Sequence, residues 1–276
     1  MTFMGQNRFT AVVLAADRNP DDPVARAAGV ACKALAPVGG RPMLLRVLDA
    51  LAGSPAVGGV ILCGPPEPVM QRDAGLRRLR DDGRFRWLPP ENSPSTSALA
   101  ALRVAPTDAP VLLTTADHAL LRPEVIDHFC REARLHGTDV AAGLASYERV
   151  MERFPGMRRT RTRFSDGAVC GCNLFAFLSP EGRRAADLWR QVENDRKHPV
   201  RMLNRLGWGV VVRYLLGRLS LEAALSHVSR RMGVTVGAVR LPFAEAAVDV
   251  DTVADWHFAE SIAVRRETEA AGRGAP

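Results

Sequence analysis

Two cations follow the first apolar run of this chain at a spacing that suits phosphate chemistry. The run covers residues 11–16, Asp17 and Arg18 come directly after it, and Lys33 lies farther along the same polar stretch. Backbone N–H groups and cations in such a loop can surround the phosphates of a nucleoside triphosphate, and an apolar strand fixes the base of the loop. The pattern therefore predicts a triphosphate-binding loop between a strand and the next helix.

Two acidic segments add oxygen ligands of the kind that a hard divalent cation prefers. Asp117 follows the apolar run over 111–115, and ligands of open α/β sheets bind beyond the carboxyl ends of the strands. Asp249 and Asp251 alternate with valines, which on a strand end would place both carboxylates on one face. Plainer interpretations stay open, because Asp117 could cap a turn and the later pair could belong to a solvated turn before a helix.

The segment from Thr10 to Pro42 resembles the signature of the sugar- and cofactor-nucleotidyltransferases, the family that includes the molybdenum-cofactor guanylyltransferases. Its second half, with Lys33, Pro37 and the two glycines at 39–40, is close to verbatim. Its first half departs from the family, because Asp17 stands where the family usually has Gly. The resemblance implies an α/β fold of the glycosyltransferase-A-like nucleotidyltransferase type.

The same resemblance extends to both acidic segments. The turn at Asp117 keeps the Asp of a Gly-Asp-x-Pro-like turn, and residues 248–256 are similar to a late Asp-x-Asp-Thr-x-x-Asp motif. The resemblance implies that Asp117 and Asp251 hold Mg²⁺ or Mn²⁺. It also implies that Lys33 stabilises the α-phosphate or the departing pyrophosphate, and that Arg18 holds the β- and γ-phosphates.

Further residues are expected to contact the nucleotide or its acceptor. Polar groups at the start of the helix over 95–104 could bind a base edge or a ribose, although any helix cap looks similar. A β-hairpin expected at about 158–178 carries Arg159, Arg161 and Arg163 on one face, either as a clamp for an acceptor phosphate or as a solvated basic face. The expected nucleotide-binding residues are Ala15, Ala16, Asp17, Arg18, Lys33, Asn92, Ser93, Ser97 and Asn173.

The elements that position these residues follow from the hydrophobic pattern. Apolar runs alternate with amphipathic stretches over the first 145 residues, which indicates βαβ units in a Rossmann-like, mostly parallel sheet flanked by helices. We expect a single domain over residues 1–276 with a helical insertion at about 180–232. Strands are expected at 11–16, 59–63, 85–88, 111–115, 139–144, 159–164, 169–177 and 235–241. Helices are expected at 43–51, 69–79, 95–104, 123–136, 180–194, 200–206, 209–219, 220–232 and 251–266.

Composition excludes several classes of protein. The chain has 276 residues, 47% of them hydrophobic, and no apolar stretch reaches the roughly 18–20 residues of a membrane span. The first residues lack the apolar core of a signal peptide, so a cytoplasmic protein is expected. The formal net charge of +7 suits a triphosphate and a phosphorylated acceptor, and no nucleic-acid partner is expected because no such binding motif accompanies it. The five cysteines lack zinc spacing and are expected to be reduced core thiols.

The stretch over 208–219 is unusually apolar for part of an insertion and also contains two arginines. It is expected either to pack in the core or to touch a membrane peripherally or a partner protein of a lipid pathway. The sequence leaves the oligomeric state open.

These features predict nucleotidyl transfer that depends on Mg²⁺. A phosphate oxygen of the acceptor would attack the α-phosphorus of a nucleoside triphosphate, and pyrophosphate would leave. A nucleotide-sugar-dependent glycosyltransferase is one alternative, although its Asp-x-Asp motif is replaced here by Ala-Asp-His. A non-catalytic nucleotide-binding regulatory protein is the other, because the carboxylate of Asp17 is unfavourable beside a triphosphate.

Overall fold

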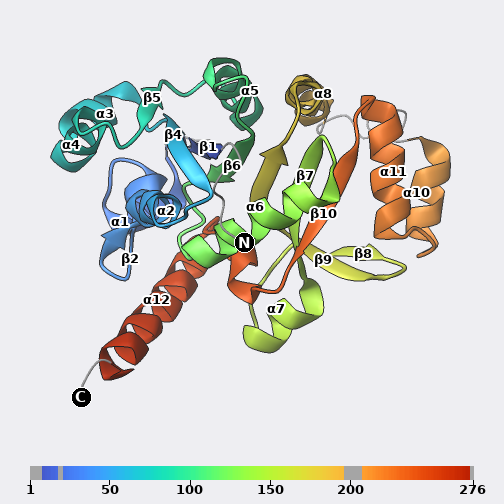
Figure 1. Ribbon diagram of the computed structural model, residues 1–276. Helices are drawn as coiled ribbons and strands as arrows, with labels where there is room; N and C mark the ends of the chain where they lie inside the picture. The colour runs from blue at the N-terminus through green and yellow to red at the C-terminus, as the bar shows by residue number, and fades with distance from the viewer. Residues whose placement is uncertain (1–7, 18–20, 196–206, 274–276) are drawn as a thin grey trace.

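The computed structural model describes residues 8–17, 21–195 and 207–273 (Figure 1). The strands of its main sheet are β1 (Phe9–Leu14), β4 (Val57–Cys63), β5 (Arg86–Leu88), β6 (Val111–Thr115), β7 (Val140–Ser146), β8 (Thr162–Phe164), β9 (Gly167–Phe177) and β10 (Val236–Leu241). They form an eight-stranded sheet in the order β10-β7-β9-β6-β1-β4-β5, with β8 paired to β9. β9 runs antiparallel to β6, β7 and β8, whereas the other pairs of this sheet are parallel, so the sheet is mostly parallel, as the sequence predicts.

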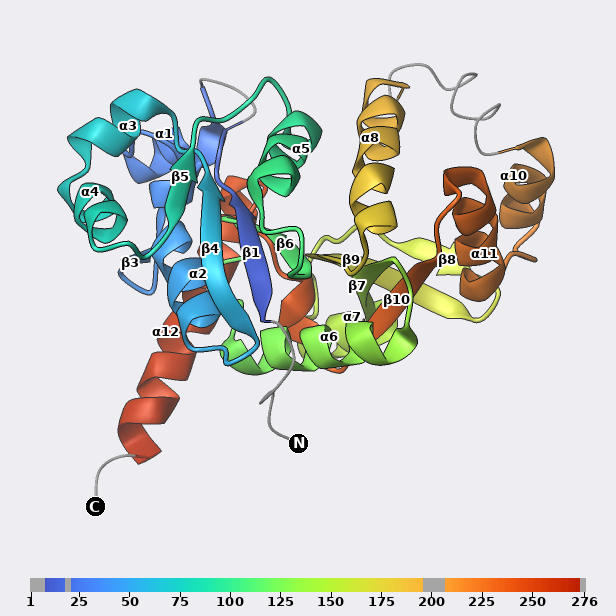
Figure 2. The ribbon, with the colours of Figure 1, turned by 45° about the horizontal axis from the view of Figure 1, so that its top comes forward.

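Helices cover both faces of this sheet. They are α1 (Pro23–Ala28), α2 (Met43–Ala52), α3 (Glu67–Arg72), α4 (Ala74–Asp81), α5 (Pro94–Val104), α6 (Pro123–His136), α7 (Tyr147–Arg153), α8 (Pro180–Asp195), α10 (Trp208–Leu215), α11 (Leu221–Met232) and α12 (Val253–Arg273). Short 3₁₀ turns are η1 (Lys33–Leu35) and η2 (Ala244–Ala247), and a small hairpin pairs β2 (Pro37–Val38) with β3 (Arg41–Pro42). The helices α5 and α8 pack on one face and α2 and α6 on the other (Figures 1 and 2).

The central strand β1 shows why a buried strand has a continuous apolar sequence. Ala11 and Val13 belong to the core beneath α2 and α6, whereas Val12 belongs to the core beneath α5. Successive side chains of a strand point to opposite faces, so a strand covered on both sides needs apolar residues at every position. The expected strand at 11–16 is therefore confirmed, with its bounds shifted by two residues at each end.

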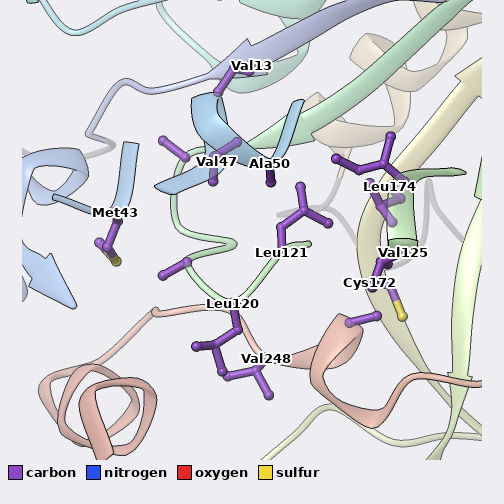
Figure 3. Packing of buried hydrophobic residues seen from close by; sticks show 14 of the residues in the cluster. Val13, Met43, Val47, Ala50, Leu120, Leu121, Val125, Cys172, Leu174 and Val248 are labelled. Atoms are coloured by element: carbon purple, nitrogen blue, oxygen red, sulfur yellow. The ribbon is translucent and has the colours of Figure 1, made fainter. Parts of the chain in front are cut away.

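The larger core also fixes the two acidic segments relative to each other. Leu120, which follows β6, is 2% exposed and lies beside Val248, which is 1% exposed (Figure 3). Because both belong to one packed cluster, the segments that carry Asp117 and Asp251 rest on a common base.

Some expected elements have different bounds. The helix expected at 69–79 is two helices, α3 and α4, because Asp73 leaves the helical conformation and its side chain caps α4 through Leu76 N at 2.8 Å. The strand expected from residue 159 begins at Thr162. The helices α1 and α7 were not expected, since each has only six or seven residues.

The helices α8, α10 and α11 lie in the range expected for the helical insertion, while the helix expected at 200–206 lies outside the described residues. Ser220 caps α11 by accepting a hydrogen bond from Ala223 N at 3.2 Å. Among the helices of the described ranges, none combines the length and the hydropathy that a membrane span requires.

Candidate active site

A cavity of about 370 Å³ lies at the carboxyl ends of the neighbouring strands β1 and β6. This is the edge at which open α/β sheets bind ligands. The lining residues are Leu14, Ala15, Ala16, Asp17, Asp22, Pro23, Lys33, Ala34, Pro94, Thr115, Ala116, Asp117 and Asp251. The structure thus brings together most of the residues that the sequence assigned to the phosphate loop and the metal. Arg18 lies outside the described residues.

Lys33 links the loop to both acidic segments. Its Nζ donates to Asp117 Oδ2 at 2.7 Å and to the carbonyl oxygen of Val250 at 2.8 Å, and lies 3.7 Å from Asp251 Oδ1. The side chains of Lys33 and Asp117 are 17% and 16% exposed, whereas that of Asp251 is 64% exposed. Burial alone would lower the pKa of Lys33, but the two carboxylates outweigh it and hold the pKa above its usual value.

Asp117 is held from two sides. Thr115 Oγ1 donates to Asp117 Oδ1 at 2.5 Å, and the backbone oxygen of Asp117 accepts a hydrogen bond from Val250 N at 3.1 Å. The latter bond ties the end of β6 to the segment before α12. His118, the next residue, is fully buried, and burial lowers its pKa to about 4, so its imidazole is neutral near pH 7.

Asp17 has a structural contact that a glycine could not make. Both of its carboxylate oxygens accept a hydrogen bond from the backbone N–H of Lys33 at 3.0 Å, which anchors the start of η1. Burial raises the pKa of Asp17, and the neighbouring Asp22 adds to that effect. Asp22 itself caps α1 through Val24 N at 2.9 Å and lines the cavity. Sequence reasoning missed Asp22, although an Asp-Pro pair is a common helix start.

Asp249 and Asp251 do not share a face as expected. Residues 248–250 form no strand, because Val250 N bonds to Asp117 rather than to a sheet neighbour. Asp251 lines the cavity, whereas Asp249 is buried and accepts a hydrogen bond from Asn173 Nδ2 at 2.7 Å.

The three hairpin arginines also separate. Arg159 forms an ion pair with Asp249, and each of these side chains is 12% exposed. Arg161 precedes β8 and lies over the ring of Tyr147, with Cζ 4.9 Å from the ring centre. The expectation of three guanidinium groups on one strand face was wrong, because regular strand geometry starts only at residue 162 and Arg163 alone of the three lies on β8.

Asn173 points toward Asp249 rather than into the cavity. Its backbone has a φ of 48°, in the left-handed region that Asn adopts more readily than most residues. It is not among the described residues that line the cavity. Asn173 and Arg159 together hold Asp249, which lies two residues before Asp251. They therefore help to position the acidic segment without lining the cavity themselves.

Serines at the start of α5 are engaged in the helix cap. Ser93 forms a reciprocal capping box with Thr96, and the buried Ser97 Oγ accepts a hydrogen bond from Glu91 N at 2.9 Å. Pro94 is the residue from this segment that lines the cavity. Asn92 is exposed. The cap interpretation therefore describes the contacts of Ser93 and Ser97, and their role toward a nucleotide stays a prediction.

The oxygen atoms around Lys33 suit a hard divalent cation. One point is surrounded by Asp117 Oδ2, the Val250 carbonyl and Asp251 Oδ1, and an ammonium group already lies there. Within the described ranges, no group of three or more His, Cys, Asp or Glu could hold a metal ion. Magnesium is commonly bound by one or two carboxylates together with substrate phosphates, so the donor set fits a cation shared with a triphosphate.

We predict that Asp17→Asn lowers KM for the nucleoside triphosphate several-fold. The amide keeps a hydrogen-bond acceptor for Lys33 N but removes a charge beside the phosphates, and one unit charge at 4 Å is worth about 1 kcal/mol in water. The same change should raise Tm at pH 7, because a raised pKa makes the ionised carboxylate costly there. This gain should vanish below pH 3.8, where Asp17 is protonated in both states. The exposed Asp21→Asn is the control. An unchanged KM in Asp17→Asn would contradict the placement of Asp17 beside the phosphates.

A second prediction concerns the buried ion pair. Arg159→Met should lower the free energy of unfolding by about 3 kcal/mol, because Asp249 is left buried without its cation. The exposed Arg161→Met should cost less than about 1 kcal/mol. Urea unfolding measures both, and Arg159→Met with Asp249→Asn should recover part of the loss. Equal effects of the two single changes would show that the ion pair adds no stability.

Comparison with known proteins agrees with this geometry. A family model, the MobA-like NTP transferase domain, matches residues 11–235. A solved structure titled as a hypothetical transferase from Thermus thermophilus is 30% identical and has a TM-score of 0.75, covering 90% of this chain and 99% of its own. No curated protein matches the chain.

More distant solved structures share the fold. A CMP:2-keto-3-deoxy-manno-octonic acid synthetase complexed with CTP is 13% identical with a TM-score of 0.57, covering 93% of this chain and 99% of its own. A 2-C-methyl-D-erythritol 4-phosphate cytidylyltransferase, also from Thermus thermophilus, is 15% identical with a TM-score of 0.50, covering 91% and 97%. Since the family model spans more than half of the sequence, the chain belongs to the MobA-like NTP transferase domain family and is a nucleotidyltransferase.

Proposed function

We propose that this nucleotidyltransferase joins a nucleoside monophosphate to a phosphorylated small molecule. The acceptor phosphate oxygen forms a bond to the α-phosphorus of the triphosphate, the bond to the bridging oxygen breaks, and pyrophosphate leaves with the electron pair. The observation that carries the proposal is the position of Lys33 Nζ, held by Asp117 and Val250 beside Asp251 in the cavity. Such a reaction needs in-line placement and charge neutralisation more than a proton-transfer residue.

Each residue of the cluster has a separate task in this scheme. Lys33 lies within reach of the cavity and would donate to the α-phosphate or to the leaving pyrophosphate. Asp117 and Asp251 would hold Mg²⁺ or Mn²⁺, which supplies positive charge to the phosphate oxygens when it is bound. Asp17 fixes the backbone of Lys33, and Thr115 fixes the carboxylate of Asp117. Arg18 is proposed to hold the β- and γ-phosphates.

The acceptor is proposed to bind on the side of the hairpin β8–β9. Arg159 and Asn173 of this hairpin region reach Asp249, two residues before Asp251. Arg159 is already paired with Asp249. Of the three arginines that were expected to clamp an acceptor phosphate, the exposed Arg161 and Arg163 are therefore the remaining candidates.

Pyrophosphate release tests the proposed function directly. The protein is incubated with each of the four NTPs, Mg²⁺ and a set of phosphorylated sugars, alcohols and pterins. CTP leads the panel, because the names of two fold relatives include CTP or cytidylyl transfer. Release that requires one NTP, a phosphorylated acceptor and Mg²⁺ supports the proposal. Glycosyl transfer from a nucleotide sugar, or nucleotide binding with no release in any combination, would contradict it.

A further inference from the structure

The helix α10 exposes four large apolar side chains along one face. Trp208, Val212, Leu215 and Leu216 are spaced by four, seven and eight residues, which places them on the same side of a helix, with Leu216 at its C-cap. They are 60%, 47%, 76% and 62% exposed, and no residue of α10 is buried. We call these four residues the α10 face. Single exposed apolar residues are ordinary, but a contiguous set marks an interaction surface.

The helix α10 is attached to the rest of the protein through other residues. Tyr214 lies edge-on to Phe164 of β8, with ring centres 6.3 Å apart. Just beyond α10, the carbonyl of the buried Leu219 accepts a hydrogen bond from Ser165 N at 2.9 Å. In both views α10 lies at the outer end of the molecule, beyond α11 (Figures 1 and 2). Other residues therefore hold α10 in place, and the α10 face is left exposed.

Exposed arginines lie on and next to the helix that carries this apolar surface. Arg213 and Arg218 are exposed on and after α10, and Arg230 and Arg231 lie in the last turn of the neighbouring α11. Residues 207–232 contain one acidic residue, Glu222. Long cationic side chains can lay their carbon stems along an apolar surface while the charge stays in water.

We propose that the α10 face docks on an anionic lipid surface. A tryptophan and leucines on one side with arginines on and next to the helix are the composition of helices that lie in the membrane interface. The arginines complement the negative potential of anionic lipids, worth about 1 kcal/mol each near the surface. Eight residues of helix span only about 12 Å, so α10 lies along the surface rather than across it.

A second copy of the chain fits this surface less well. A stable dimer usually buries roughly 800 Å² on each partner. Four partly exposed side chains on an eight-residue helix offer less area than that. The arginines on and next to α10 would also oppose one another in a symmetric pair.

Vesicle sedimentation tests the proposal with the full chain. Vesicles of phosphatidylcholine are compared with vesicles that also contain phosphatidylglycerol. The protein should sediment with the anionic vesicles and less in high salt. Leu215→Glu with Leu216→Glu should weaken this binding at least about tenfold, since two apolar side chains no longer enter the lipid. Leu135→Glu, at a leucine of α6 that is 73% exposed, is the matched control and should bind as the unchanged protein does.

Three outcomes would overturn the proposal. The first is failure to bind either vesicle, and the second is binding that the two glutamates leave unchanged, which would place the contact outside the α10 face. The third is a dimer in light scattering that the same double change dissociates, which would assign the α10 face to a second copy. Pyrophosphate release from soluble substrates should be the same for all variants, because the α10 face lies outside the cavity.

Discussion

Asp117→Asn is expected to lower nucleotidyl transfer by on the order of a thousandfold while the fold stays intact. Asparagine keeps the shape and still accepts a hydrogen bond from Thr115, so the packing at the end of β6 is preserved. The change removes the negative charge that holds Lys33 Nζ at 2.7 Å and that would hold the divalent cation. Turnover is measured as pyrophosphate release at saturating Mg²⁺, with the exposed Asp49→Asn as the control.

The double variant with Asp251→Asn sharpens this test. Both carboxylates lie close to one atom, with oxygens 2.7 and 3.7 Å from Lys33 Nζ. Groups that act on the same cation act as a unit, so the double variant should be little worse than Asp117→Asn alone. Losses that simply add would show that the two carboxylates do not share a cation.

Lys33→Met is expected to lower turnover about a hundredfold, because a preorganised charge at the developing phosphate charge is worth roughly 3 kcal/mol of barrier. Methionine fills most of the same volume, so the packing around η1 is kept. Lys33 also satisfies Asp117 and the Val250 carbonyl, and a fall in Tm should accompany the loss of activity.

Stability and catalysis can be separated in that variant. Adding Asp117→Asn to Lys33→Met removes the buried unpaired charge and should restore part of the Tm, yet turnover should stay low. If Lys33→Met released pyrophosphate at a near-normal rate, the assignment of Lys33 would be wrong.

The sequence predicted the sheet and the meeting of Lys33, Asp117 and Asp251 for identifiable reasons. Central strands such as β1 are apolar at every position, and parallel strands bring their carboxyl ends to one edge. The signature around Lys33 then assigned the chemistry of that edge. The cavity confirms that these side chains lie together, while their roles in catalysis stay predictions.

Contacts between distant segments could not be predicted in the same way. The pairing of Arg159 with Asp249 joins residues that are 90 positions apart. Strand alternation instead grouped Arg159 with the other two hairpin arginines and grouped Asp249 with Asp251. Alternation applies only where a sheet neighbour fixes the backbone, and neither residue has one. The composition likewise showed that 208–219 is unusually apolar, but not whether this stretch packs in the core or faces the surroundings.

The most direct test of the central claim is a crystal structure with Mn²⁺ and a non-hydrolysable NTP analogue. We expect an anomalous peak between the carboxylates of Asp117 and Asp251, bonded to an oxygen of the α-phosphate. The ammonium of Lys33 should have moved from Val250 to the phosphates. A triphosphate bound away from the cavity at β1 and β6, or a Mn²⁺ ion that neither carboxylate contacts, would contradict the account.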